Sequence, residues 1–117
     1  MSRQEMPIFT RTFDFLTWLL PVTNNFPTAQ RHSFAHRLLD AAFDLRERLE
    51  GANLRSGAAR QERLALADEA LAKIRLYLRL AHRWNWLSSG QYEHVSAMVV
   101  EIGRLLGGWQ KTVTNRK

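Results

Sequence analysis

The stretch from Glu69 to Trp86 has the spacing of one long helix, and it constrains the fold more than any other part of the sequence. At about 100° per residue, its apolar side chains cover well over half of the helix circumference. They are Leu71, Ile74, Tyr77, Leu78, Leu80, Ala81 and Trp84. A helix that packs once against its own domain needs an apolar stripe only somewhat wider than ~100°. The wide arc therefore predicts that this helix is covered from more than one side.

The remaining strip of this helix is basic. Arg75, Arg79 and Arg83 follow one another at i, i+4 spacing, and no acidic residue stands three or four positions away from any of them. The three cations repel one another at a cost of ~0.2–0.5 kcal/mol per pair. A solvated surface tolerates such a row, but an external polyanion turns the small cost into a favourable interaction. The strip is therefore a candidate binding surface.

The net charge of the chain is concentrated in the same part. Up to Ala72, nine Lys and Arg balance nine Asp and Glu, whereas from Lys73 onward eight face two, which accounts for the whole net charge of +6. A basic pole suits a phosphate backbone, an anionic membrane surface or an acidic protein, and by itself it does not choose among them. A basic protein whose charge serves only solubility has the same composition.

Length and composition limit the class of protein. At 117 residues, the chain makes one domain with a single core. It contains no apolar run of the ~18–20 residues that a membrane span requires, and its first residues lack the layout of a secretion signal. The absence of Cys excludes disulfides, thiolate metal ligands and Cys nucleophiles. We therefore expect a cytoplasmic protein without a membrane partner.

Apolar residues recur at helical spacing in four segments, and no segment shows a strand pattern. The sequence therefore predicts an all-α chain that folds as an antiparallel up-down four-helix bundle. We expect helices over about residues 8–21, 29–53 and 58–86, and a fourth helix that begins after Ser88. The expected organisation is a flexible arm at 1–7, the bundle at 8–112 and a basic tail at 113–117.

Local signals mark the ends of these helices. Pro21 is expected to kink or end the first helix near its last turn, because proline lacks an N–H and crowds the preceding turn. Thr28 and Ser56 are candidate N-caps for the second and third helices. Ser88, followed three residues later by Gln91, matches the capping-box pattern at the start of the fourth helix.

Charges on the second helix are expected to pair with one another along the helix surface. The expected pairs are Arg37 with Asp40, Asp44 with Arg48, and Arg46 with Glu50. On the fourth helix, Gly103 and Gly107 stand one turn apart, and each weakens a lone helix by ~1 kcal/mol relative to Ala. Close approach of another helix over these glycines, within the bundle or between subunits, is the simplest reason for their presence.

Signals of catalysis are weak. His32, His36 and Asp40 follow one another at i, i+4 spacing and could present three ligands to a metal, but this pattern is more often ordinary surface polarity. The sequence contains no HExxH, GxGxxG, P-loop or GxSxG motif. We therefore expect no enzyme, no catalytic residue, no metal and no cofactor. Of the aromatic residues, Trp86 is the candidate for contact with a partner, since it projects near the arginine strip.

Two segments of the chain resemble a known family. They are LALADEALAKIRLYLRLAHRW and SSGQYEHVSAMVVEIGRLLGGWQK, within which KIRLYLRL and EIGRLLGGW are the specific parts. These segments are similar to the accessory variability determinant proteins of diversity-generating retroelements, which belong to a broader group of four-helix bundles that includes ribosomal intervening-sequence proteins. The similarity is strongest from about Leu64 to Lys111.

The resemblance implies a homopentamer of four-helix bundles that forms a basic barrel. It also implies binding to the retroelement's reverse transcriptase and to its structured template RNA, or to an RNA/cDNA hybrid, in support of mutagenic cDNA synthesis. The basic residues that such contacts use in the family fall here on Arg75, Arg79, Arg83, Arg104 and Lys111. The resemblance does not separate polymerase contacts from RNA contacts. The alternatives are a self-associating structural bundle and a general RNA-binding bundle unrelated to reverse transcription.

Overall fold

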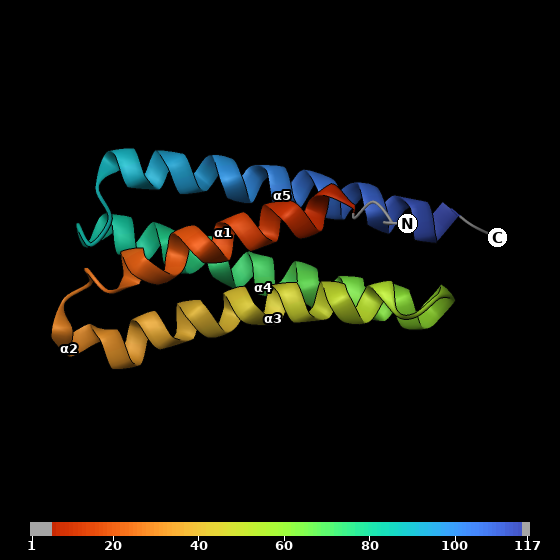
Figure 1. Cartoon of the computed structure of the whole chain (residues 1–117), viewed down its shortest axis with the longest axis horizontal. Coiled ribbons are helices and arrows are strands. Elements are labelled where there is room, and N and C mark those ends of the chain that lie inside the picture. The colour runs from red at the N-terminus through yellow and green to blue at the C-terminus, as the bar shows by residue number, and fades with distance from the viewer. Residues whose placement is uncertain (1–5, 116–117) are drawn as a thin grey trace, which may run out of the picture.

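The structure is a computed structural model and describes residues 6–115. Within this range the chain forms four long helices and no strand, which confirms the predicted four-helix bundle (Figure 1). The long helices are α1 (Pro7–Thr23), α3 (His36–Asn53), α4 (Gly57–Arg83) and α5 (Ser89–Asn115). A short helix α2 (Thr28–Gln30) and a π-helical turn η1 (Arg31–Ala35) lead directly into α3.

Consecutive long helices run in opposite directions and enclose one core (Figure 1). Helix α1 packs against α3 and α5, and α4 packs against the same two helices, so α1 and α4 occupy diagonal corners of the bundle. The core consists mainly of fully buried Leu, Ile and Ala, together with Phe9, Phe15 and Phe26. This arrangement leaves four lateral surfaces, one between each pair of neighbouring helices: α1 and α3, α3 and α4, α4 and α5, and α5 and α1.

Helix α1 begins at Pro7, which the sequence pattern assigns to the flexible arm. Proline suits the first helical position because its missing N–H has no partner to lose there. The helix continues through Pro21 and ends two residues later, at Thr23. The rest of the predicted arm, residues 1–5, lies outside the described residues.

The entry into α3 differs from the sequence expectation. Thr28 does not cap the helix; it is the first residue of α2, and Pro27 holds the N-cap position. The Thr28 hydroxyl instead accepts a hydrogen bond of 2.8 Å from Nη2 of Arg31. Ser56 does hold the N-cap position of α4, but its side chain makes no capping hydrogen bond.

Helix α4 ends at Arg83, three residues earlier than expected. Asn85 adopts a left-handed conformation with φ of 64°, which asparagine tolerates better than most residues. The N–H of Trp86 then donates to the carbonyl of Ala81 at 2.8 Å, and the N–H of Asn85 donates to His82 at 3.0 Å. These two bonds form a Schellman motif, which satisfies the last carbonyls of the helix and turns the chain toward α5.

Helix α5 begins with the predicted capping box. The Ser88 hydroxyl accepts a hydrogen bond from the N–H of Gln91 at 3.0 Å, and the Gln91 side chain accepts one from the N–H of Ser88 at 2.9 Å. The helix then extends to Asn115, so residues 113–115 of the expected tail are helical. Half-buried Val113 packs against the core, which explains the extension. Residues 116 and 117 lie outside the described range.

Candidate nucleic-acid interface

The arginine strip of α4 is exposed, as the sequence predicted. Arg75, Arg79 and Arg83 all lie on the solvent side of the helix. Across residues 6–115, the ion pairs that form within 4.0 Å are Arg46 with Glu50 and Arg104 with Glu101. None of the three α4 arginines takes part in either pair, so their guanidinium groups keep their charge available to a partner.

The five predicted binding residues do not form one compact patch. Gln61, near the start of α4, donates a hydrogen bond to Thr114 of α5 at 3.4 Å. Lys111 lies one turn from Thr114 and is therefore beside the start of α4. Arg83 is the last residue of α4, at the opposite end of the bundle. At 1.5 Å per residue, Lys111 and Arg83 are separated by about 30 Å along the bundle. A single small ligand cannot reach both, but an extended polyanion can.

Arg104 is the one predicted binding residue that already has an acidic partner within the described range. Its Nε and Nη2 donate to the two carboxylate oxygens of Glu101 at 3.0 and 2.7 Å. These hydrogen bonds lower the pKa of Glu101 and raise that of Arg104, and Arg11 on α1 lowers the pKa of Glu101 further. Arg104 also lines a different hollow from Arg75 and Arg79, one next to Met6 and the start of α1. Its charge is therefore less available than that of the α4 arginines.

Arg75 and Arg79 share a groove between α4 and α5, which we call the α4/α5 groove. Its volume is about 180 Å³. It is lined by Arg75, Leu78, Arg79, Tyr92, Ser96, Val99 and Val100. The Tyr92 ring stacks on the His82 ring, with centroids 4.3 Å apart and planes only 4° from parallel. This stacking fixes the Tyr92 side chain at the edge of the groove.

Gly103 of α5 lies beneath the Arg75 side chain. A Cβ placed on Gly103 would come within 2.5 Å of Nη2 of Arg75 and 3.5 Å of Cδ2 of Leu71. The guanidinium therefore rests on a part of α5 that carries no side chain. This contact explains one of the two glycines that the sequence singled out. No side chain in the described range lies within 4 Å of the corresponding position on Gly107, so that glycine has no such role within one chain.

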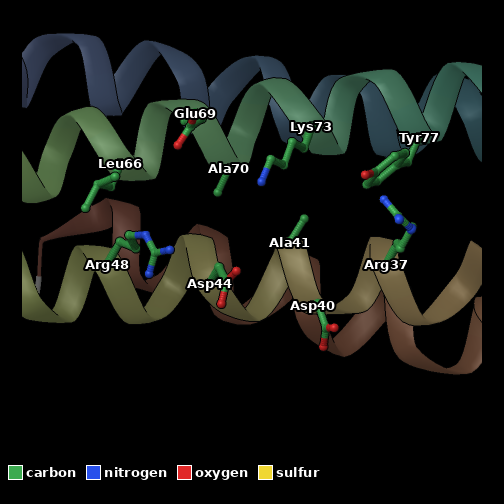
Figure 2. A pocket seen from close by; sticks show the side chains of 10 residues that line it. All are labelled: Arg37, Asp40, Ala41, Asp44, Arg48, Leu66, Glu69, Ala70, Lys73 and Tyr77. Carbon is green, nitrogen blue, oxygen red and sulfur yellow. The ribbon is translucent and has the colours of Figure 1, made fainter.

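A second groove, between α3 and α4, has a different charge pattern (Figure 2). Its volume is about 160 Å³. Three cations and three carboxylates line it; they are Arg37, Arg48 and Lys73 with Asp40, Asp44 and Glu69. The opposite charges balance, so this groove does not present a net positive surface.

Two of the three ion pairs expected on the second helix do not form. Only Arg46 and Glu50 of that helix come within ion-pair distance. Arg37 extends instead toward Tyr77 on α4, as Figure 2 shows. The Nε of Arg48 is buried and has no hydrogen-bond partner among the described residues. Both arginines line the groove shared with α4, which helical spacing on α3 alone could not reveal.

The aromatic residues at the end of α4 correct another expectation. Trp86, the aromatic candidate for partner contact, is packed against Phe26 and Phe34 at centroid distances of 5.8 and 5.3 Å. Trp84, which the helical pattern predicts to be buried, is 48% exposed. The reversal follows from the early end of α4, because Trp84 and Trp86 lie beyond the last helical turn and no longer follow its spacing.

The histidine ladder does not assemble as a three-ligand site. His32 belongs to the π-helical turn and lines a hollow beside Thr23, whereas Asp40 lines the α3/α4 groove. A π-turn changes the spacing of side chains relative to an α-helix, so the i, i+4 register between His32 and His36 is lost. In the described part of the chain, no three His, Asp or Glu side chains lie close enough together to hold a metal ion.

Sequence reasoning missed Tyr92 and Ser96, the two hydroxyl residues of the α4/α5 groove. The sequence did hold a signal for them in its spacing. Ser96 follows Tyr92 by four positions and Gly103 follows Ser96 by seven, so the three residues share one face of α5. What the sequence could not show is that this face meets Arg75 and Arg79.

Four antiparallel helices with an unpaired row of arginines among the described residues define the class of protein as a basic four-helix bundle. Residues 6–113 match the family described as bAvd-like, and the chain belongs to that family. This confirms the resemblance to the accessory variability determinant proteins.

A solved structure shares the fold. It is the crystal structure of a protein of unknown function from the S23 ribosomal protein family of Bacteroides thetaiotaomicron, with a TM-score of 0.81 and 18% sequence identity. The similarity covers 89% of this chain and 95% of that chain. At this identity the likeness concerns the fold alone. No curated protein matches the chain. None of the helices within residues 6–115 is long and apolar enough to cross a membrane.

Proposed function

We propose that this chain is a noncatalytic accessory protein of a diversity-generating retroelement. In this role it binds the retroelement's reverse transcriptase and structured template RNA in the cytoplasm and supports mutagenic cDNA synthesis. Membership of the bAvd-like family supports the accessory role. The contacts with polymerase and RNA are our inference from the surface of the bundle.

The observation that carries the proposal is the row of arginines on α4. Arg75, Arg79 and Arg83 are exposed, and no carboxylate within the described residues pairs with them. At 1.5 Å per residue, successive members of the row are about 6 Å apart along the helix axis. A linear array of positive charge is complementary to a polynucleotide, which carries a negative charge at every nucleotide.

An apolar surface between α1 and α3 supports self-association. Phe13 and Leu20 on α1 are 63% and 50% exposed, and Phe43 on α3 is 44% exposed. Arg46 of α3 contacts Phe9 of α1. Because the two helices are antiparallel, Phe13 and Phe43 both lie one turn from this contact in the same direction. We infer that copies of the chain associate through this surface, and the family resemblance implies a pentamer.

The experiment replaces Arg75, Arg79 and Arg83 together with Ala in the full chain. Binding to the template RNA and to the polymerase is measured over a range of salt concentrations. We expect a folded variant whose RNA affinity is at least tenfold lower at low salt. Its salt dependence should be shallower by about 0.7–0.9 in log–log slope for each phosphate that the variant no longer neutralises. The matched control removes three exposed arginines elsewhere: Arg31, Arg37 and Arg55.

The two triple variants remove the same charge, so a difference between them reports position rather than net charge. Equal affinity of the α4 variant and the unmodified chain for both partners would exclude the arginine row from the function. A purely structural bundle would show no salt-sensitive association with RNA and would not copurify with a polymerase.

A further inference from the structure

The α4/α5 groove differs from the other groove along α4 in its charge. The groove shared with α3 is lined by three carboxylates as well as three cations (Figure 2). The α4/α5 groove is lined by Arg75 and Arg79, with no acidic side chain among its described lining residues. Both grooves lie between neighbouring helices and have similar volumes. The absence of acidic side chains among its described lining residues is therefore what distinguishes the α4/α5 groove as an anion site.

Two residues with hydroxyl groups line the groove together with the two arginines. Tyr92 and Ser96, one turn apart on α5, line the side that faces α4. Arginine and hydroxyl side chains are common donors to phosphate oxygens in protein–nucleic acid contacts. Arginine adds a planar fork of N–H groups that matches a phosphate. The apolar side chains of Leu78, Val99 and Val100 complete the lining of the groove; Leu78 and Val99 are buried and Val100 is exposed.

The absence of a side chain at Gly103 leaves room for the Arg75 guanidinium. A Cβ at position 103 would approach Nη2 of Arg75 to 2.5 Å, closer than side chains pack. The atom in conflict is the far end of a flexible side chain, so the bundle can accept alanine at this position by moving the guanidinium. A change at Gly103 therefore displaces the cation and leaves the packing of the helices intact.

We propose that the α4/α5 groove binds a backbone phosphate of RNA, with Arg75 and Arg79 as binding residues and Gly103 as a positioning residue. This inference rests on the proposed nucleic-acid binding and names the site within it. The row of Arg75, Arg79 and Arg83 places three cations along one line, and a polynucleotide carries a negative charge at every nucleotide.

The test compares Gly103→Ala with Gly107→Ala in the full chain. Both changes raise the helix propensity of α5, and they stand one turn apart, but only the first conflicts with Arg75. The probe is a labelled single-stranded oligoribonucleotide of mixed sequence, titrated at several salt concentrations. We expect Gly103→Ala to weaken binding threefold to tenfold and to lower the salt slope by about 0.7–0.9. Gly107→Ala should bind as the unmodified chain does, and thermal unfolding should show both variants folded.

Arg75→Ala extends the test to a double-mutant cycle. The single variants Arg75→Ala and Gly103→Ala should lose similar affinity, and the double variant should lose little more, because both remove the same contact. Unchanged RNA binding by Gly103→Ala alongside weaker binding by Arg75→Ala would overturn the positioning role. Loss of polymerase binding with unchanged RNA binding in Arg75→Ala would assign the groove to an acidic protein segment and overturn the phosphate site. If the unmodified chain does not bind RNA at any salt concentration, the proposed function fails as well.

Discussion

The guanidinium of Arg46 on α3 lies over the ring of Phe9 on α1, with its central carbon 5.1 Å from the ring centre. The same side chain donates to the Phe9 carbonyl at 2.9 Å and to the Thr12 hydroxyl at 3.3 Å, and it pairs with Glu50 at 2.8 Å. Arg46 therefore links α1 to α3, and it uses its charge inside the bundle. It differs in this respect from the arginines of α4.

We expect Arg46→Ala to destabilise the chain by about 1–3 kcal/mol, because it removes charge-assisted hydrogen bonds to the Phe9 carbonyl and the Thr12 hydroxyl together with the guanidinium contact on the Phe9 ring. Urea denaturation followed by circular dichroism measures the change. Arg55→Ala is the matched control, since Arg55 is exposed in the turn after α3 and, among the described residues, donates only to the Gly51 carbonyl at the end of that same helix. Equal stability of the two variants would contradict the inference that the contacts of Arg46 with α1 stabilise the bundle.

The capping box gives a second stability prediction. Ser88→Ala should cost about 0.5–2 kcal/mol, because the N–H of Gln91 loses its side-chain acceptor at the start of α5. Ser56→Ala at the start of α4 should cost less, since Ser56 makes no capping hydrogen bond there. Thermal and chemical unfolding of both variants measure the difference. A larger loss for Ser56→Ala would contradict the presence of a capping hydrogen bond at Ser88 and its absence at Ser56.

The pair of Glu101 and Arg104 makes a prediction about pH. Hydrogen bonds from Arg104 lower the pKa of Glu101 below its ordinary value of 4.5. The stabilisation is therefore complete above this value and is lost as the pH falls through the lower pKa of the folded chain. In Arg104→Ala, the pKa of Glu101 should rise toward 4.5. NMR titration of the carboxylate measures it, and an unchanged pKa would mean that the pair does not form in solution.

The same ion pair limits the share of Arg104 in RNA binding. A phosphate that approaches Arg104 meets the negative charge of the Glu101 carboxylate, whereas Arg75 has no acidic partner within the described residues. Arg104→Ala should therefore weaken RNA binding less than Arg75→Ala does at equal salt. The two variants remove the same charge, so titration of one RNA with both is a direct comparison. A greater loss for Arg104→Ala would place the main contact on the outer face of α5.

The apolar surface between α1 and α3 predicts a variant with impaired self-association. Phe13→Ser combined with Phe43→Ser removes two exposed rings, so it should cost little stability in a single copy while weakening assembly. Sedimentation velocity at several concentrations measures the assembly. Leu76→Ser with Val100→Ser is the control, since these residues are also exposed but lie on α4 and α5. Loss of assembly in the control variant alone would place the interface on the side of α4 and α5, which carries the arginine row.

Periodicity predicted most of the fold but not how the helices meet. The four helices and the capping box of Ser88 and Gln91 follow from local patterns, and both are present. Periodicity places the end of α4 too late, because the left-handed conformation of Asn85 overrides an apolar pattern that continues to Trp86. Asparagine is a known C-terminal signal, so Asn85 could have marked this end.

The candidate site likewise combines features that helical spacing predicts with features that depend on how the helices pack. Spacing on α4 correctly placed Arg75, Arg79 and Arg83 on one exposed face. Spacing on α5 allows the i, i+3 pair of Arg104 and Glu101, but it could not show that this pair forms while that of Arg37 and Asp40 does not. It also could not show that Arg104 lines a separate hollow. Nor could it show that Gly103 meets Arg75, since the register between two helices depends on how the whole core packs.

Helices α1 and α4 stand at diagonal corners, and this placement has a consequence for how the chain can vary. Because Phe13 and Arg79 lie on these two separate helices, the free-energy effects of changing them should simply add. Substitutions can therefore change the proposed recognition of a polyanion without altering the proposed self-association, and the reverse also holds. Each of these two proposed kinds of binding can therefore evolve independently of the other within one small domain.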